Sequence, residues 1–474
     1  MKKFICSALA AAAVCGTAYA EGYQINSLSA KQIGMGHTGV ALKLGAESMF
    51  FNPAGLGFMD KTLDLSGSLT GIMPTATATV DGKDYKTDNG ISTPIGVHAA
   101  FSIYDNLKAG ISFYTPYGSS INWTDNWPGA VLNQNVNLKV FTIQPTIAWA
   151  ITPKLSVGAG AMISWGSVDL NKGLVTAETA DRALTVLGQL PEGTPGQLPA
   201  GTPGFGSTTP ASVNLNGQAE MTVGFNVGAM YDITDRLTVG ASFRSRMPMK
   251  VKAGDASVSY VNDLSRDLFG KKGLDLLNKA NFKAEMPCPW VLGLGVSYKP
   301  IDRLTLAFDA RLTGWHTYRQ LDIEFLNEKL AAYNQHIEKK YKNSWCYSLG
   351  AEFAVTNRFD VRAGLMVDTS PVNNKYYNPE TPGMTKVEPT VGLSFRPIPS
   401  LSIDLGFMYV AGLGVDNASC QYADLLGGQM INELTEMGLP QQQIEALGFK
   451  PSGTFTADYK LHAFIPSIGV SYSF

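Results

Sequence analysis

The chain ends in Phe464-Ile-Pro-Ser-Ile-Gly-Val-Ser-Tyr-Ser-Phe474, with an apolar or aromatic residue at every second position up to the last. The residues between them are mostly small and polar. Because a strand shows successive side chains on opposite faces, this tail has one apolar and one mostly polar face. An aromatic residue at the extreme C-terminus is typical of bacterial outer-membrane barrels, in which the last strand closes the cylinder and removes the free edge. The tail therefore predicts an all-β transmembrane barrel.

The N-terminus agrees with export. Lys2 and Lys3 precede an apolar run over residues 4–14, and Ala18-Tyr19-Ala20 supplies the small residues that a signal peptidase recognises. We expect a signal peptide of residues 1–20. A lipoprotein with Cys15 as the lipidated residue is the alternative, but Val14 is a poor residue at the preceding position.

The composition fits a barrel in a membrane. No later stretch has the eighteen or so apolar residues that a spanning helix needs, yet the chain is 45% hydrophobic with a mean hydropathy of +0.00. In barrels the outward apolar and inward polar residues cancel in any window. The 49 glycines and 19 tyrosines suit bends and aromatic girdles. A large secreted soluble β-protein is the alternative reading.

Charge and cysteines exclude several functions. The formal charge of −2 becomes −4 without Lys2 and Lys3, so nothing favours nucleic acid. After export, Cys288, Cys346 and Cys420 remain at wide spacings. An odd number at such spacings predicts neither a disulfide framework nor a metal cluster, although one bridge stays open. We expect no metal and no cofactor.

A degenerate repeat of short turns counts the strands. Ile151-Thr-Pro-Lys-Leu-Ser-Val157 resembles Ile233-Thr-Asp-Arg-Leu-Thr-Val239, and four more such turns lie near residues 104–109, 301–306, 355–361 and 397–403. Each joins two alternating segments through Asp, Asn, Pro or Thr, the residues of tight turns. Six turns join twelve strands, and one further strand at each end makes fourteen, with both ends on the periplasmic side. The expected strands are 62–73, 94–104, 107–116, 137–150, 155–168, 217–232, 237–252, 284–299, 303–318, 344–355, 359–370, 387–396, 401–413 and 460–474.

The alternation also assigns the faces of the wall. In 304–313 the apolar residues alternate with Asp309 and Arg311, and in 359–365 they alternate with Asp360 and Arg362. Arg or Lys at the bilayer midplane costs about 2–4 kcal/mol on the lipid face. We therefore expect these charges to face the lumen.

The long connections lie on the other side. Apolar residues near helical spacing predict helices in 253–283 and in 320–342. The connection 169–216 contains the tandem octapeptide Gln189-Leu-Pro-Glu-Gly-Thr-Pro-Gly196 and Gln197-Leu-Pro-Ala-Gly-Thr-Pro-Gly204, which predicts an extended tract. Exposed apolar loop helices either cover one another above the barrel or bind a hydrophobic ligand.

Residues 21–60 do not alternate as a strand does. Gly34, Gly36 and Gly39 match the spacing of a dinucleotide fingerprint, but no βαβ unit surrounds them, so we reject nucleotide binding. These glycines instead suit close backbone packing. The segment ends in Asn52-Pro53-Ala54, an extended or turn motif between Phe51 and Leu56. Forty residues before a periplasmic strand are enough to fold into a barrel this wide, which needs a plug if it is not to leak.

A signal peptide, a glycine-rich segment closing in Asn52-Pro53-Ala54, fourteen strands and a terminal Phe474 together resemble the FadL/TodX (OMPP1) family. Members are outer-membrane transporters of long-chain fatty acids and aromatic hydrocarbons. The resemblance covers essentially the whole mature chain. It implies a hatch (plug) of residues 21–60 anchored by Asn52, Pro53 and Ala54 inside a barrel of residues 61–474.

The resemblance also implies a ligand path. A surface groove would be built from 169–216 and 253–283, with candidates Leu264, Leu268, Phe269, Leu276 and Leu277. The ligand would leave sideways at a kinked third strand, where Gly110 and Pro116 weaken the ladder.

The leading hypothesis is passive uptake of hydrophobic small molecules by a monomeric outer-membrane protein whose Phe474 is read by the barrel-assembly machinery. A ligand carboxylate would need a lumen cation, for which Arg244, Arg246, Arg311 and Arg362 are candidates unless they pair with wall acids such as Asp309, Asp360 and Asp404. A general diffusion porin is the alternative, and the segment of residues 21–60 before the first strand disfavours it. A hydrolase is disfavoured because the five histidines, His462 among them, offer no evident base beside a nucleophile.

Overall fold

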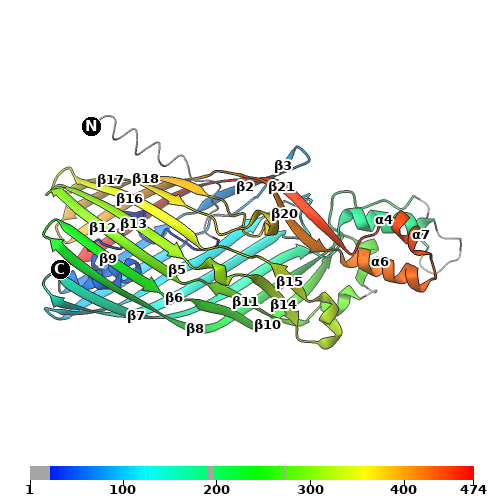
Figure 1. Ribbon diagram of the computed structural model, residues 1–474, viewed down its shortest axis with the longest axis horizontal. Helices are drawn as coiled ribbons and strands as arrows, with labels where there is room; N and C mark the ends of the chain where they lie inside the picture. The colour runs from blue at the N-terminus through cyan, green and yellow to red at the C-terminus, as the bar shows by residue number, and fades with distance from the viewer. Residues whose placement is uncertain (1–21, 125, 190–191, 193–196, 200, 271–272) are drawn as a thin grey trace.

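The fold is a closed ring of antiparallel strands, seen along its length in Figure 1. The computed structural model describes residues 22–124, 126–189, 192, 197–199, 201–270 and 273–474. The predicted signal peptide lies outside these residues, as does part of the octapeptide tract. Within the described residues fourteen strands form the ring, in the number that the sequence predicts. In ring order they are β1 Leu63–Thr70, β4 Ile95–Tyr104, β5 Leu107–Asn122, β6 Asn135–Thr152, β7 Leu155–Gly173, β8 Ala211–Thr234, β9 Leu237–Arg244, β12 Val291–Ile301, β13 Leu304–Thr313, β16 Ser344–Ala354, β17 Phe359–Asp368, β18 Lys386–Ile398, β19 Leu401–Gly412 and β21 Ser452–Ser473.

The C-terminal strand closes the ring. β21 pairs with β19 on one side and with β1 on the other, from Asp64 opposite Ser473 to Thr70 opposite Ser467. The carbonyl oxygen of Phe474 also accepts hydrogen bonds from Thr62 N (2.8 Å) and Leu63 N (3.0 Å). Closure leaves no ladder edge between the first and last strands, which is the condition for a sheet to stand in hydrocarbon.

The two faces of the wall divide as the alternation predicts. Asp309, Arg311, Asp360 and Arg362 are all buried on the inner face, whereas their apolar neighbours along β13 and β17 are exposed on the outer face. The outer face carries aromatic residues near the short turns, among them Tyr104, Trp149, Tyr231, Tyr298, Phe359 and Tyr472. No helix in the described part of the chain combines the length and apolar character needed to cross a membrane.

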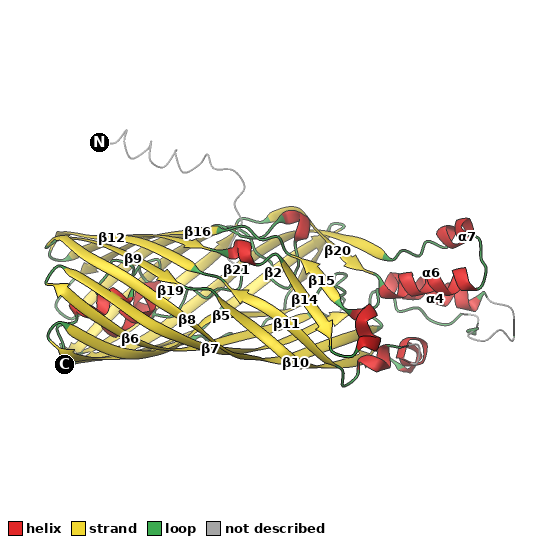
Figure 2. Ribbon diagram, turned by 60° about the horizontal axis from the view of Figure 1, so that its bottom comes forward, coloured by secondary structure: helices red, strands yellow, loops and turns green. Residues whose placement is uncertain are grey.

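The six predicted turns are confirmed, and they lie at the end of the ring where the chain terminates (Figure 1). At the other end the wall extends into extra strands and short helices (Figure 2). The extra strands are β2 Met73–Val80, β3 Lys83–Lys86, β10 Met247–Tyr260, β11 Asn281–Cys288, β14 Gln320–Phe325, β15 Gln335–Glu338 and β20 Val415–Ala423. The helices there are α4 Ala177–Gly188, α5 Asp263–Ser265, η3 Arg266–Gly270, η4 Leu274–Leu277, η5 Trp315–Thr317, η6 Glu328–Tyr333, η7 Asn374–Tyr376, α6 Leu425–Glu436 and α7 Gln441–Ala446.

The helix predicted over 320–342 is wrong. Leu321, Ile323 and Phe325 are buried in strand β14, which pairs with β11 and β15, and only the short η6 is helical. Their spacing of two residues is the period of a strand. Taken together with the apolar residues that follow in η6, however, they resemble the spacing of a helix. Two long predicted strands also divide, since 237–252 becomes β9 and β10 and 284–299 becomes β11 and β12.

The segment of residues 22–60, called the N-terminal segment below, folds inside the ring near its short-turn end (Figure 2). It consists of four short helices joined by irregular backbone. They are α2 Ala30–Ile33, η1 Gly45–Glu47, α3 Ser48–Phe51 and η2 Pro53–Phe58. α2 lies against β18 and β19, and η2 lies against β6, β7 and β8 on another side of the lumen.

Inward-facing glycines of the wall let the backbone of this segment approach closely. A Cβ atom on Gly364 would stand 2.2 Å from Gly36 N, and one on Gly350 would stand 2.3 Å from Met35 O. Gly36 itself has a φ of +62°, which only glycine adopts without strain. The wall and the segment are therefore matched at the level of the backbone.

We expect Gly364→Val to keep the strand but to displace the N-terminal segment, because an inserted side chain overpacks the contact by about 1–3 kcal/mol. Limited trypsin digestion followed by mass spectrometry should show faster cleavage at Lys31. Gly67→Val is the matched control, since the nearest atom to a Cβ on Gly67 is 3.9 Å away. Unchanged cleavage in a folded Gly364→Val barrel would contradict the close contact.

Candidate ligand-binding site

The inner wall supplies hydrogen-bond partners to the irregular backbone of the N-terminal segment. The carboxylate of Asp309 accepts from Gly39 N (2.7 Å) and Val40 N (3.0 Å), and Gln144 and Asn226 both donate to Met49 O. Buried backbone groups need such partners, so the polar lumen is what allows this segment to fold there. Further contacts join Ser68 to Leu28 O, Thr70 to Ser27 O, Arg244 to Phe50 O, Ser297 to Ala41 O, and Gly36 N to Thr390.

Asn52 links two parts of the segment to the wall. It is fully buried and donates to Val40 O (2.8 Å) and to Ala229 O of β8 (3.1 Å), while its Oδ1 accepts from Ala54 N. Pro53 follows as the first residue of η2, where a missing N–H costs nothing. No other side chain of similar size offers both a donor and an acceptor in this geometry without a charge.

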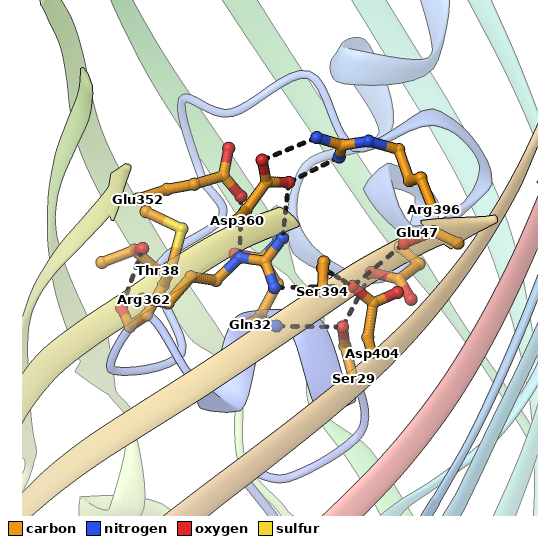
Figure 3. Close-up of polar contacts among 12 residues, drawn as sticks. Ser29, Gln32, Thr38, Glu47, Glu352, Asp360, Arg362, Ser394, Arg396 and Asp404 are labelled. Atoms are coloured by element: carbon orange, nitrogen blue, oxygen red, sulfur yellow. Dashed lines mark hydrogen bonds and ion pairs between the residues drawn. The ribbon is translucent and has the colours of Figure 1, made fainter. Parts of the chain in front are cut away.

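A charged cluster lies where α2 meets β16 to β19 (Figure 3). Arg362 is fully buried, and its guanidinium faces Glu352 (2.7 Å), Asp404 (3.4 Å) and Asp360 (3.7 Å). Arg396 forms a two-pronged pair with Asp360, at 2.5 and 2.6 Å. Removing one member of such a set leaves an uncompensated buried charge, so the cluster ties strands β16 to β19 together on their inner face.

Glu47 belongs to the same region (Figure 3). It is buried in the N-terminal segment and accepts a hydrogen bond from Ser29 Oγ at 2.7 Å. Burial raises the pKa of Glu47 to about 7, the Ser29 hydrogen bond lowers it in part, and the charge of Asp404 raises it further. Glu47 therefore titrates near neutral pH inside the lumen.

Above the N-terminal segment, the upper lumen contains a narrow cavity with almost wholly apolar walls. Apolar walls with a few polar groups are typical of sites for small hydrophobic ligands. Of the described residues that line this cavity, Lys139 and Glu380 are the two that carry a charged group, and Tyr23 adds a phenol. The apolar walls come from β6, β7, β8, β10, β11 and β14, including Leu138, Leu170, Leu215, Met249, Phe282 and Ile323.

A polar cap borders the cavity, formed by Lys172, Lys339, Gln335 and Glu380. Glu380 is buried and forms an ion pair with Lys339, whose side chain is fully buried. Lys172 follows Leu170 on the inner face of β7, donates to Gln335 Oε1 at 2.8 Å, and lies within electrostatic reach of Glu380 and Lys339. The cap thus sets two ammonium groups against one carboxylate beside an apolar cavity.

A second cavity, called the wall cavity below, lies beside β5. Residues of β5 pair with β4 only as far as Tyr114, and the register with β6 shifts between Tyr114 and Tyr117. Past this bulge the freed edge of β5 is covered by the N-terminal segment, because Ile25 N donates to Pro116 O and Gly118 N donates to Tyr23 O, both at 2.9 Å. The wall cavity beside this edge shares Ser119, Leu138, Lys139, Val140 and Thr381 with the apolar cavity.

A third hollow lies between the helices of the long connections. Ala180, Leu184 and Leu187 of α4 face it, with Leu426 and Met430 of α6 opposite. Asp424 joins the two helices, since it caps α6 through Gly427 N (2.9 Å) and accepts from Thr179 of α4. The residues of 266–277 that line it are Leu268, Phe269 and Leu274.

The four candidate arginines do not line the apolar cavity. Arg244 lies over the ring of Phe50 at 4.4 Å, Arg311 contacts His37 Nδ1 at 3.0 Å, and Arg362 belongs to the charged cluster. Arg246 is exposed and faces Glu285 at 3.4 Å. The alternative expectation, that these arginines pair with acidic residues of the wall, holds for Arg362. Arg244 and Arg311 instead contact the N-terminal segment.

The remaining candidates divide between cavities and packing. Pro116 lies in the bulge of β5, whereas Gly110 is regularly paired with Ala100 and Thr146. In the expected groove, Leu268 and Phe269 line the hollow, Leu276 is exposed, and Leu277 is buried in the core. Leu264 packs against that core at its margin. Gly34 packs against Gly392, and Gly39 against the ring of Phe51.

Sequence reasoning missed the polar cap and the helices of the last long connection. Lys339 and Glu380 lie in two different connections, and nothing in the sequence pairs them. α6 does carry a signal, since Leu426, Met430 and Leu434 follow one another at four-residue spacing and are buried on one face. Among the described residues, Cys288, Cys346 and Cys420 are buried.

A closed fourteen-strand ring, a filled lower lumen and an apolar upper cavity define an outer-membrane channel for small molecules rather than an open pore. Residues 11–474 match the family described as outer membrane protein transport protein (OMPP1/FadL/TodX). The chain belongs to this family of transport channels and is an outer-membrane protein, not an enzyme.

Named relatives and solved structures agree. Outer membrane protein P1 of Haemophilus influenzae is 23% identical over 438 residues, covering 87% of this chain and 91% of the relative. The long-chain fatty acid transport protein of Escherichia coli K12 is 22% identical over 430 residues, covering 86% and 92%. A Pseudomonas aeruginosa FadL homologue has a TM-score of 0.73 at 18% identity over 96% of this chain and 100% of its own. The Pseudomonas putida toluene transporter TodX has a TM-score of 0.64 at 15% identity over 95% and 99%.

The titration of Glu47 predicts a pH-dependent attachment of the N-terminal segment. Between about pH 4.5 and 7 the buried carboxyl keeps its proton, whereas the same group in a released segment is ionised. The stabilisation is full below that window and is lost as the pH rises through it. Hydrogen exchange in residues 22–60, corrected for its intrinsic rate, should be faster at pH 8 than at pH 5.

We expect Glu47→Gln to remove most of this pH dependence and to slow exchange at pH 8. Glu445→Gln, on the surface helix α7, is the control and should leave the pH profile unchanged. A profile in Glu47→Gln as steep as that of the unmodified protein would show that another group is responsible.

Proposed function

We propose that the protein carries hydrophobic small molecules, long-chain fatty acids or aromatic hydrocarbons, across the outer membrane by passive diffusion. The ligand enters from the extracellular hollow, passes into the apolar cavity and leaves sideways through the wall at β5. The observation that carries this proposal is that the apolar cavity and the wall cavity share the lining residues Ser119, Leu138, Lys139, Val140 and Thr381, which we call their junction. The family relatives named for fatty acid and toluene transport support the ligand class.

In this proposal the N-terminal segment acts as a hatch. It fills the lower lumen and lends hydrogen bonds from residues 23–25 to the unpaired edge of β5. Movement of these residues would widen the wall opening without breaking any ladder between ring strands. A lateral exit also keeps an insoluble ligand out of water, because it passes from an apolar cavity to the bilayer.

A general diffusion porin is the weaker alternative. The lower lumen is filled by the N-terminal segment. Asn52 within it and Asp309 of the wall make buried hydrogen bonds to its backbone, and Arg362 is buried in the wall beside it. A polar solute would need that whole segment to leave, at the cost of every hydrogen bond that the wall makes to it.

A ligand carboxylate, where present, would meet the polar cap rather than the four arginines. Lys172 and Lys339 stand at the end of the apolar walls, and their two positive charges exceed the single negative charge of Glu380. Charge-assisted hydrogen bonds to a carboxylate are roughly twice as strong as neutral ones. The polar cap therefore supports fatty acids as ligands, while the apolar walls suit either class.

Filling the junction should stop transport without stopping expression. We expect Ser119→Trp to reduce uptake of radiolabelled oleate or toluene at least about tenfold in a Gram-negative host that lacks its own channels, because the indole occupies both cavities at their junction. Ser259→Trp on β10 is the matched control, since Ser259 is exposed and lines neither cavity. Normal uptake through a folded Ser119→Trp barrel would exclude this route.

A further inference from the structure

The loop 369–385 stands between the apolar cavity and the wall cavity. Glu380 and Thr381 line the first, and Thr381, Pro382 and Gly383 line the second. Since both cavities share Thr381, this loop forms part of the wall that divides them. We call residues 380–383 the partition.

The partition is buried, and the side chains that hold it come from different parts of the chain. Trp123 Nε1 donates to Pro379 O at 3.1 Å, and Tyr341 Oη lies 2.9 Å from Thr381 Oγ1. The one charged contact is the ion pair of Glu380 with Lys339. Because both of these side chains are buried, the pair is shielded from water and from salt, unlike a surface pair.

Lys339 has surroundings suited to exchange of its carboxylate partner. Its ammonium lies 5.9 Å from the centre of the Tyr318 ring, and its partner Glu380 reaches the edge of the apolar cavity. Lys172 adds a second cation within electrostatic reach. A carboxylate that entered the cavity would therefore approach the same ammonium that Glu380 already occupies.

We propose that Glu380 is an internal carboxylate that holds the partition in place through Lys339, and that the carboxylate of an incoming ligand takes its place. This inference rests on the proposed function, because it concerns the same cavity. Exchange releases Glu380 from Lys339 and loosens the partition on the side of the wall cavity. An uncharged hydrocarbon does not displace Glu380, so it passes the partition while the ion pair of Glu380 with Lys339 stays intact. Glu380 thus sets the preference between charged and neutral ligands.

The experiment compares two probes with the same chain and different head groups, cis-parinaric acid and the corresponding alcohol, on the full-length protein in lipid nanodiscs. We expect Glu380→Gln to tighten binding of the acid about tenfold, equivalent to about 1.4 kcal/mol, because the neutral amide competes poorly for Lys339. Binding of the alcohol should change less than about twofold. Glu380→Asp keeps the charge and should keep the unmodified preference, which separates charge from packing.

Glu338→Gln is the matched control, since Glu338 pairs with Lys340 at 3.0 Å on the adjoining surface and is half exposed. It carries the same change of charge and should alter neither affinity. The double variant Lys339→Met with Glu380→Gln leaves no buried charge unpaired, and it should lose the preference for the acid. Hydrogen exchange in 369–385 should rise when the acid binds the unmodified protein and stay constant with the alcohol.

The outcomes separate the two proposals. If the unmodified protein binds neither probe, the proposed function itself is wrong. If it binds both, and Glu380→Gln changes the two affinities equally or weakens the acid, the exchange of carboxylates is wrong while the transport route stands. Equal rates of hydrogen exchange in 369–385 with the acid and with the alcohol would likewise contradict the replacement of Glu380 by the ligand carboxylate.

Discussion

The pairing of β21 with β1 is the interaction on which the rest of the structure depends. Hydrocarbon offers no partner to a peptide N–H or C=O, so a sheet can stand in it only as a closed ring. Seven residue pairs from Asp64 to Thr70 join the last strand to the first. Closure then fixes the inner and outer faces of every strand, and with them the place of each charge. The polar lumen is a consequence of the apolar exterior.

A polar lumen is also what lets an irregular segment fold inside it. The N-terminal segment has too little helix to satisfy its own backbone, and the wall supplies the missing donors and acceptors from Asp309, Gln144, Asn226 and others around the ring. Glycines opposite its tightest turns remove the side chains that would hold it away. The N-terminal segment and the inner wall therefore satisfy each other's polar groups.

The upper half of the barrel follows a different rule. There the inner face turns apolar and the ladder between β4 and β5 stops. Polar groups are few, and they are concentrated in the cap around Lys339 and Glu380. In the proposed function, this apolar upper half binds and releases the ligand, while the filled lower half keeps the membrane closed.

The sequence by itself determined the ring. Period-two alternation and the recurring short turns, such as that at Asp235-Arg236, depend on local chemistry, so they count the strands and orient their faces before any tertiary contact forms. It also placed Asn52 and Pro116 at points where the backbone departs from regular structure. Only the tertiary structure decided the partners across the lumen. Arg311 contacts the N-terminal segment, and Lys339 meets Glu380 from another connection, because contacts between distant parts of a chain leave no local pattern to read.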